Sequence, residues 1–334
     1  MNISVVDRAG YNNKSLLYSA TRTVTRQQPV IEKQAEDKFE TFLFLPEGAA
    51  RQGEGGLRTQ GYFKTSLEGK PLITVVTVVF NGEQFLEETI LSVMNQTYEN
   101  IEYIIIDGGS TDGTLNIIKK YENSIDYWVS EYDRGIYDAM NKGIALSQGD
   151  FIGFLNADDL YNLEVIEELS NALSLNDFDF TVGVVNLINR ESQTIGLMRP
   201  LKSLDYNKGQ YIKMPTAHMA FFIKRKLLKQ NGGFDKVVGL SSDYDLILRT
   251  LLVTNRVYHF KETVGSFRDG GVSSSYFKSF LSTYKVHKKN GIPYQKRSSV
   301  FLLSMLKKII LNFLPSFMRV YLLKRFGSGR FELK

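Results

Sequence analysis

An apolar, β-branched run at positions 73–80, with the sequence ITVVTVVF, constrains the fold of this chain more than any other feature. Such a run is typical of a strand that is buried on both faces of a sheet. A helix is expected next, with Asn81 as its N-cap and with Leu86, Ile90, Val93 and Met94 on one side. A second strand at 101–106 and a second helix at 115–121 follow. This alternation predicts a parallel sheet with right-handed crossovers.

A third apolar run, at 151–155, leads into the tetrapeptide Asn156-Ala157-Asp158-Asp159. Carboxylates where a buried strand ends often hold a hard divalent cation, and such a cation often holds phosphates. The alternative is that Asp158 and Asp159 cap a helix expected over 160–173. Active sites of parallel sheets lie beyond the carboxyl ends of the strands, so the position favours a site.

The loop at 107–114, with the sequence DGGSTDGT, follows the second expected strand. Its glycines would let a ligand approach the backbone, and the helix start that follows favours anions. The spacing is neither that of a dinucleotide-binding site nor that of a P-loop, so both of those classes are excluded. Asp107 could accept a hydrogen bond from a base or a ribose. The alternative is a tight turn, which also favours Gly, Ser and Asp.

Composition limits the chemistry and the domain count. A chain of 334 residues is long enough for one large or two modest domains, and 43% of its residues are hydrophobic. It has no cysteine and three histidines, so any metal is expected to be bound by oxygen. Residues 1–70 are polar and are expected to form an irregular extension. The first residues lack a secretory signal pattern, so a cytoplasmic location is expected.

The charge is concentrated at the C-terminal end. Residues 278–334 carry 13 Lys and Arg and one acid, Glu332, whereas residues 1–277 have a net charge of −7. If 300–325 is helical, one face is apolar and consists of Leu303, Leu306, Ile310, Phe313, Leu314, Phe317 and Tyr321. This pattern favours a helix that lies on an anionic membrane surface. The longest uncharged run is 10 residues, too short to span a bilayer. The alternative is a helix packed on the domain.

Taken together, these segments resemble the family 2 glycosyltransferases of the nucleotide-sugar-dependent GT-A fold. The resemblance covers about residues 71–265, and the closest likeness is to bacterial enzymes that assemble O-antigen (lipopolysaccharide), capsule or colanic-acid-type polysaccharides. The pieces that carry it, in the family's order, are Val75–Asn81, Ile104–Thr114, Asp133–Gly143, Gly149–Asp159, Gly232–Asp235 and Ser242–Leu246.

The resemblance implies a role for each matching residue. Asp107 corresponds to the aspartate that contacts the uracil of the donor, with Val79 and Phe80 beside the base. Asp158 corresponds to the second aspartate of the Asp-x-Asp motif, which coordinates Mg²⁺ or Mn²⁺ bound to the donor diphosphate. Asp243 corresponds to the catalytic base of the family's Glu-Asp motif, and the alternative for this residue is a helix N-cap.

The sequence departs from the family pattern at two positions. Asn156 stands where the first aspartate of Asp-x-Asp usually lies; an amide can still form hydrogen bonds there, so weaker metal binding is expected. Ser242 replaces the glutamate before the catalytic base.

Three further residues are candidates for binding the donor. His218 lies where related enzymes carry a histidine near the acceptor or the donor phosphates; a buried structural histidine is the alternative. Asp133 and Arg134 could reach the nucleotide or its phosphates, or they could form a surface ion pair.

The resemblance implies an α/β GT-A fold: one Rossmann-like nucleotide-binding domain at 71–265, with a mostly parallel mixed sheet flanked by helices, and a helical C-terminal tail at 266–334. The expected activity is an inverting, Mn²⁺- or Mg²⁺-dependent transfer of one sugar from a nucleotide-sugar donor, UDP-linked, to a lipid-linked saccharide. The enzyme would act at the inner face of the plasma membrane. The alternative is a non-catalytic nucleotide-sugar-binding or scaffold protein. Nucleic acid is not an expected partner, because the tail aromatics follow a helical stripe.

Overall fold

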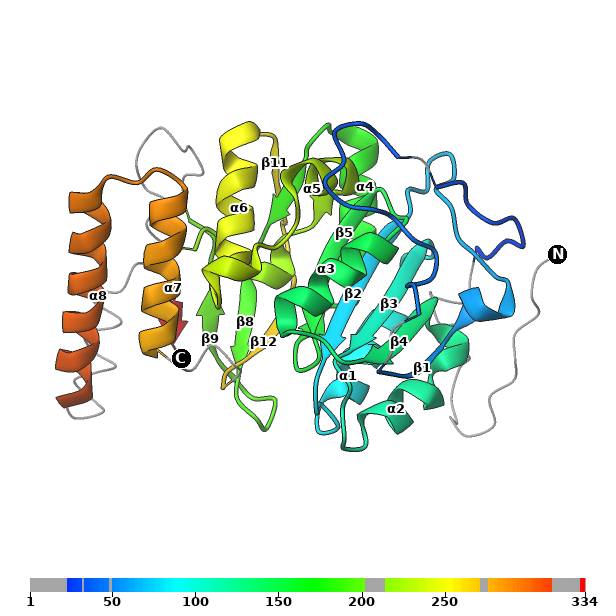
Figure 1. Ribbon diagram of the computed structural model, residues 1–334, viewed down its shortest axis with the longest axis horizontal. Coiled ribbons are helices and arrows are strands. Elements are labelled where there is room, and N and C mark those ends of the chain that lie inside the picture. The colour runs from blue at the N-terminus through cyan, green and yellow to red at the C-terminus, as the bar shows by residue number, and fades with distance from the viewer. Residues whose placement is uncertain are drawn as a thin grey trace. The chain divides into compact units, whose positions relative to one another are not determined.

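The computed structural model describes residues 23–31, 33–47, 50–201, 214–270, 276–313 and 331–333 (Figure 1). The chain forms two compact units. The first comprises Met1–Asp177 and Phe222–Gln230, and the second comprises Phe178–Phe221 and Asn231–Lys334. The segments expected from the sequence, 1–70, 71–265 and 266–334, divide the chain differently and stay predictions.

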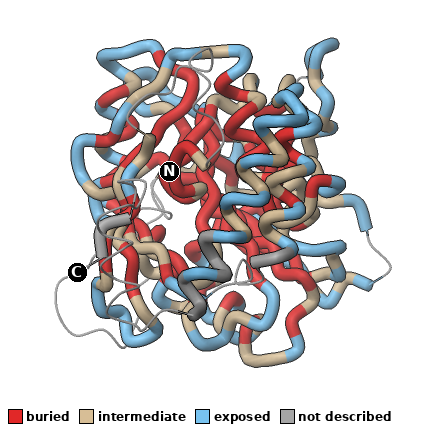
Figure 2. The backbone as a smooth tube through the Cα atoms, turned by 90° about the vertical axis from the view of Figure 1, so that its left-hand side faces the viewer, coloured by how far each residue is buried: buried red, intermediate tan, exposed pale blue. Residues whose placement is uncertain are grey.

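The first unit is built on a mixed sheet whose central strands are parallel. In spatial order the strands are β1 (Arg51–Gly55), β4 (Tyr127–Glu131), β3 (Ile101–Asp107), β2 (Ile73–Val79), β5 (Phe151–Asn156) and β10 (Ile223–Lys224). The pairs β2–β3, β3–β4 and β2–β5 are parallel, whereas β1 and β10 pair antiparallel to their neighbours. The β-branched run at 73–79 therefore forms the centre of the sheet, and every residue of β2 is buried. Figure 2 marks the buried stretches of the chain in red.

Helices connect the parallel strands, as the alternation of the sequence predicts. They are α1 (Leu86–Met94), α2 (Thr114–Lys120) and α3 (Ile136–Leu146), which follow β2, β3 and β4. Other elements are α4 (Val165–Leu175), α5 (Arg225–Asn231), and the short elements η2 (Leu57–Gln60), η3 (Glu122–Ser124) and β6 (Leu160–Tyr161). The four apolar residues expected on one side of α1 are all buried. Helix α3 packs so closely on β2 that a Cβ on Gly143 would overlap the side chain of Val76.

Two expected helix starts are wrong. Asn81 is not the N-cap of α1: Phe85 is, and Asn81 has a φ of 51° and binds a neighbouring loop through its side chain. The helix expected over 160–173 begins at Val165, with Glu164 as its N-cap, because the preceding residues form β6. Asp158 and Asp159 therefore do not cap a helix, and the capping alternative for them is excluded.

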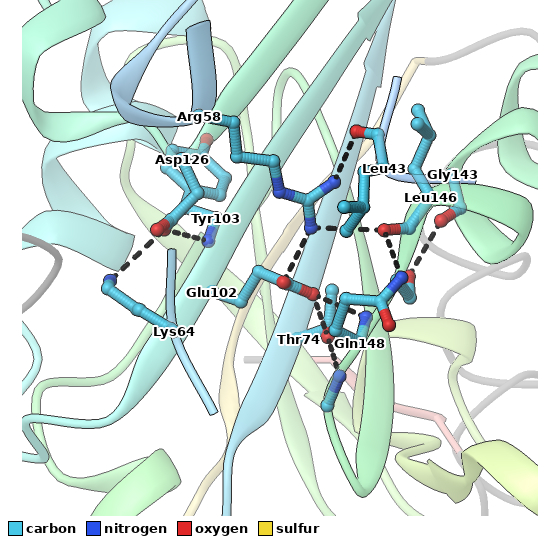
Figure 3. Close-up of polar contacts among 12 residues, drawn as sticks. Leu43, Arg58, Lys64, Thr74, Glu102, Tyr103, Asp126, Gly143, Leu146 and Gln148 are labelled. Carbon is cyan, nitrogen blue, oxygen red and sulfur yellow. Dashed lines mark hydrogen bonds and ion pairs between the residues drawn. The ribbon is translucent and has the colours of Figure 1, made fainter. Parts of the chain in front are cut away.

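Part of the segment at 1–70 is regular, although an irregular extension was expected there. Strand β1 pairs with β4, and two cations that follow it, Arg58 and Lys64, are buried. Figure 3 shows their polar contacts. Arg58 donates to Glu102 over 2.5 Å and to the carbonyl oxygens of Leu43 and Leu146, both over 3.0 Å. Lys64 donates to Asp126 over 3.1 Å. These partners lie far along the chain, so the sequence pattern around 51–64 gave no sign that the segment is buried.

The second unit contains two groups of strands. Strands β7 (Phe180–Val182) and β11 (Val257–His259) are parallel, and β13 (Phe331–Leu333), β9 (Thr194–Met198), β8 (Val185–Ile188) and β12 (Gly265–Arg268) lie side by side in that order. Its other elements are η5 (His218–Ala220), η6 (Lys236–Val238), α6 (Ser242–Val253), α7 (Tyr276–Lys289) and α8 (Tyr294–Phe313).

The expected tail helix at 300–325 coincides in part with α8. The helix starts earlier, at Tyr294, and residues 314–325 lie outside the described part of the chain. Its inner side contacts α7, where the rings of Tyr284 and Phe301 meet edge to face at 5.8 Å. Its outer side is apolar and exposed: Leu302, Leu303, Leu306 and Ile310 are 63%, 65%, 53% and 49% exposed. Among the helices that the structure describes, none combines the length and apolarity needed to cross a membrane.

Candidate active site

The carboxyl ends of three adjacent strands bring three of the predicted donor-binding residues, Val79, Asp107 and Asn156, to one edge of the first unit's sheet. Asp107 at the end of β3 pairs with Val79 at the end of β2, and Asn156 at the end of β5 pairs with Val78. Val79 is buried, whereas the ring of Phe80, the next residue, is 64% exposed. An exposed aromatic ring beside strand-end polar groups is suited to stacking against a planar ligand.

Asp107 is fully buried, and its carboxylate is held by serines on both sides. Oδ2 accepts hydrogen bonds from Ser130 Oγ on β4 over 2.6 Å and from Ser110 N over 3.1 Å. Oδ1 accepts from the Ser110 hydroxyl. The carboxylate therefore fixes the loop after β3 to the neighbouring strand. The uracil contact implied by the resemblance stays a prediction.

Asp133 lies directly against the backbone of Gly108. A Cβ on Gly108 would overlap the Asp133 carboxylate, so the missing side chain at 108 makes room for it. Oδ1 of Asp133 accepts a hydrogen bond from Gly135 N over 2.7 Å, and Oδ2 accepts none from the described residues. Burial raises the pKa of this carboxyl above its usual range, although the Gly135 N–H acts in the opposite direction. Arg134 is exposed, and its backbone N donates to Asp138.

The glycine-rich loop at 107–114 is bonded to the loop after β2. We name these hydrogen bonds the loop clamp: Asn81 N to Ser110 Oγ (2.8 Å), Thr111 N to Asn81 Oδ1 (2.9 Å), Gly82 N to Thr114 Oγ1 (2.9 Å), Glu83 N to Asp112 Oδ2 (3.1 Å) and Gly113 N to Glu83 Oε2 (2.7 Å). Two backbone amides of the glycine-rich loop, those of Thr111 and Gly113, are thus satisfied within the protein. These bonds are consistent with the tight-turn interpretation, and anion binding by this loop stays a prediction.

Asn156 is the last residue of β5, and Asp158 lies in the turn that follows. The side-chain oxygen of Asn156 is buried and has no hydrogen-bond partner among the residues that the structure describes. Asp158 is half-buried and lies two residues further on. A buried, unsatisfied acceptor costs free energy unless a ligand or water completes it, so this turn is suited to a polar ligand.

A divalent cation fits this turn only if a ligand supplies most of its oxygens. Among the described residues, no group of three or more His, Asp or Glu is placed to hold a metal. Mg²⁺ in phosphate-handling sites is commonly bound through one or two carboxylates, with phosphate oxygens and waters completing the shell. The single carboxylate of Asp158, with the unsatisfied Asn156 oxygen near it in sequence, is compatible with such a site.

Asp243 belongs to the second unit, in the first turn of α6. The helix begins at Ser242, and its N-cap is Ser241, so Asp243 is not the cap that the alternative interpretation expected. The Asp243 carboxylate accepts a hydrogen bond from Tyr244 N over 2.8 Å, and the residue is half-buried. Ser242 is fully buried. A half-buried carboxylate in the first turn of a helix is accessible, and the positive end of the helix dipole favours its ionised form. Only the ionised form can accept a proton.

His218 is also in the second unit, at the start of η5. Its ring meets that of Phe267 edge to face with centroids 6.0 Å apart, and the residue is half-buried. Both interpretations of this histidine, a donor or acceptor contact and a structural residue, stay open.

Sequence reasoning missed Ser130, which holds Asp107 from a strand 23 residues away. The only signal was a polar residue inside the apolar run of β4, which by itself does not reveal its partner.

Comparisons with known proteins identify the family. Residues 74–232 match the model of glycosyl transferase family 2. An uncharacterized glycosyltransferase of Mycobacterium tuberculosis is 33% identical over 195 residues, which cover 56% of this chain and 71% of the relative.

Solved structures show the same fold. The 1–349 fragment of TarS from Staphylococcus aureus, in complex with UDP-GlcNAc, matches with a TM-score of 0.55 and 17% identity, covering 70% of this chain and 71% of that one. The mannosyltransferase PcManGT of Pyrobaculum calidifontis, in complex with GDP-Man and Mn²⁺, matches with a TM-score of 0.52 and 17% identity, covering 78% and 80%. The expected GT-A fold is therefore confirmed, and the chain belongs to the family 2 glycosyltransferases.

Proposed function

We propose that this glycosyltransferase is metal-dependent and inverting, and that it transfers one sugar from a UDP-linked donor to a lipid-linked saccharide in bacterial surface polysaccharide synthesis. The observation that supports this most is the common sheet edge at which Phe80, Asp107 and Asn156 end up, with Asp158 following. Two proteins of the same fold were solved with nucleotide sugars, one of them also with Mn²⁺.

The donor nucleotide is proposed to lie at this edge. Phe80 offers an exposed ring beside the base, and Asp133 offers a carboxylate oxygen that accepts no hydrogen bond from the described residues. Asp107 contributes by fixing the loop that carries Gly108, and Arg134 is exposed next to Asp133.

Asp158 would hold the Mn²⁺ or Mg²⁺, with the donor diphosphate supplying further oxygens. When bound, the cation neutralises the charge that develops on the departing nucleoside diphosphate. Asn156 would contribute a hydrogen bond in place of a second carboxylate, which is the basis for expecting weaker metal binding.

Asp243 is proposed to accept the proton of the acceptor hydroxyl. The hydroxyl oxygen forms a bond to the anomeric carbon while the bond from that carbon to the diphosphate oxygen breaks. The proton remains on Asp243, the nucleoside diphosphate leaves, and attack from the opposite face inverts the anomeric centre. A positioned carboxylate contributes roughly 10²- to 10⁴-fold to such a step. For His218 we propose a contact near the donor phosphates or the acceptor.

The outer face of α8 supports the proposed membrane location. Four exposed aliphatic residues line it, and the helix contains Lys296, Arg297, Lys307 and Lys308 but no acidic residue. An apolar face beside cations is the pattern of helices that lie in an anionic membrane surface. Attachment to the inner face of the plasma membrane would bring the enzyme to a lipid-linked acceptor.

The catalytic proposal is tested with a panel of nucleotide sugars in the presence of Mn²⁺ or Mg²⁺. Nucleotide release is measured with and without lipid-linked acceptor, for the wild type and for Asp243→Asn, and UDP binding is measured for both. Wild-type turnover and loss of turnover by the variant, with UDP binding retained, would support the proposal. A fully active variant would reject the base assignment. Nucleotide binding without turnover by the wild type would favour the non-catalytic alternative.

The membrane proposal is tested by flotation with vesicles of phosphatidylcholine, with and without phosphatidylglycerol. The wild type is compared with a full-length variant in which Leu302, Leu303, Leu306 and Ile310 are replaced by Ser. The wild type should float with the anionic vesicles and the variant should not. Equal flotation of the two proteins, or flotation of neither, would reject the role of this face.

A further inference from the structure

Helix α7 holds the chain that leads into α6. Ser241, the N-cap of α6, donates its backbone N–H to Ser282 Oγ of α7 over 2.9 Å, and its hydroxyl lies 3.2 Å from Thr283 Oγ1. The Ser282 hydroxyl in turn donates to the carbonyl oxygen of Val238. Ser241 and Ser282 are buried, so these bonds are protected from water. The turn before α6 is therefore fixed from the α7 side.

The next contact joins Tyr244 of α6 to His287 of α7. The Tyr244 hydroxyl lies 3.0 Å from His287 Nε2, and the two rings meet edge to face with centroids 5.8 Å apart. The residues are 3% and 1% exposed. Burial, together with the nearby Lys296 ammonium, lowers the pKa of His287 to about 4. The imidazole is therefore neutral near pH 7 and can serve as a hydrogen-bond partner inside an apolar contact.

Asp245 provides the third contact and is fully buried. Its Oδ2 accepts hydrogen bonds from Arg249 over 2.8 Å and from Lys289 at the end of α7 over 2.9 Å. Its Oδ1 accepts from Asn290 over 2.9 Å. A buried carboxylate with this many charged and polar donors is strongly held in place.

The residues that make these three contacts from the α6 side, Ser241, Tyr244 and Asp245, flank Asp243 in the sequence but lie on a different side of the helix. At about 100° per residue, Asp243 is turned about 100° to 160° away from Ser241, Tyr244 and Asp245. Helix α7 thus grips one face of the first turn of α6, while the half-buried Asp243 carboxylate lies on a different face. Any tilt or shift of this turn would move the carboxylate.

We propose that α7 is a positioning element of the active site: through Ser282, His287 and Lys289 it sets the position of the general base Asp243. The inference rests on the proposed function, because it takes Asp243 as the base. The proposal gives α7 a role on α6 within the second unit, whereas residues 266–334 as a whole are expected from the sequence to form a membrane-associated tail. Displacing a catalytic group by about 1 Å can lower a rate by about 10²-fold, so the contacts of α7 with α6 matter for turnover.

The test uses the full-length protein and the Tyr244→Phe variant, which removes only the hydroxyl that meets His287. Turnover is followed as UDP release from the preferred UDP-sugar with Mn²⁺, and UDP binding is measured by calorimetry. We expect kcat to fall about tenfold, as the loss of one buried hydrogen bond implies, while the Kd for UDP stays within about twofold. His287→Gln, which keeps a hydrogen-bonding group, should retain more activity than His287→Ala.

A double-mutant comparison separates positioning from general structure. In an Asp243→Asn background, Tyr244→Phe should cause no further loss of turnover, because the group being positioned is already gone. A full additional loss there, or a Tyr244→Phe single variant with wild-type kcat, would overturn the inference while leaving the base assignment intact. An Asp243→Asn enzyme with wild-type turnover would overturn the base assignment and the inference with it.

Discussion

The carboxylate of Asp133 fills the space in which a side chain on residue 108 would lie. Gly108 follows Asp107 at the end of β3, and Asp133 comes from the loop after β4. The glycine therefore has a steric purpose in addition to allowing a tight turn: it lets a carboxylate from another loop lie against the backbone at the sheet edge.

Gly108→Ala should weaken nucleotide binding although it removes no polar group. The added methyl displaces the Asp133 carboxylate, so the variant should lose as much UDP affinity as Asp133→Ala, roughly 10-fold or more, as loss of a charge-assisted hydrogen bond implies. Calorimetry with UDP measures this. Because both changes remove the same interaction, the double variant should bind no more weakly than either single variant. Independent, additive losses would contradict the argument.

Glu102→Gln should destabilise the first unit strongly. It leaves the buried Arg58 guanidinium without its countercharge, and breaking a buried ion pair in this way costs about 3–5 kcal/mol. Urea unfolding gives the free energy. The matched control is Glu99→Gln in the pair Glu99–Lys70, whose side chains are 42% and 52% exposed; it should change stability by less than about 1 kcal/mol. Similar losses in the two variants would show that burial of the pair is unimportant.

Stability should fall in mild acid because of His287. Its pKa is lowered to about 4 in the folded chain from its ordinary value of 6.5, so below pH 6.5 the unfolded chain binds a proton that the folded chain does not. The contribution of the neutral His287 to the free energy of unfolding is complete above pH 6.5. It is lost at about 1.4 kcal/mol per pH unit as the pH falls toward 4. The check is the pH dependence of unfolding for the wild type and His287→Gln. Between these two pH values the variant should show a shallower slope, and identical slopes would contradict the prediction.

Asn156→Asp should strengthen metal binding. A carboxylate at the end of β5 adds a charged oxygen where the wild type has an amide oxygen with no hydrogen-bond partner among the described residues. Hard divalent cations bind carboxylates more tightly than amides, so the Mn²⁺ concentration that half-saturates UDP binding should fall several-fold. Asp158→Asn is the opposing control and should raise it. No change in either variant would show that the cation binds elsewhere.

The sequence predicted the elements whose residues are apolar in a regular pattern. Strands β2 and β3 lie within about one residue of the expected ranges, because both are buried on each face and read as uninterrupted apolar runs. Strand β1 was missed, because its sequence RQGEG carries little apolar signal. Its two glycines leave room for the neighbouring Trp128 ring, which a side chain at either position would contact. The buried Arg58 and Lys64 were also beyond reach, because their partners are 44 and 62 residues away.

The candidate site was predictable to a similar degree. Position along the strands brought Asp107 and Asn156 to one edge, as expected for parallel strands. The sequence could not show that Ser130 would hold Asp107, or that α7 would hold α6, because both depend on contacts between segments that are distant along the chain. Asn81 illustrates the same limit: it was expected to cap α1 but instead binds the loop after β3.

The loop clamp has a consequence for engineering donor preference by exchanging loops between relatives. Residues 81–83 and 110–114 each donate hydrogen bonds to the other segment and accept hydrogen bonds from it. A chimera that replaces only one of these segments would therefore leave polar groups of the other without hydrogen-bond partners. The two loops form a single transplantable module, and insertions in either one should be tolerated only when the other is exchanged with it.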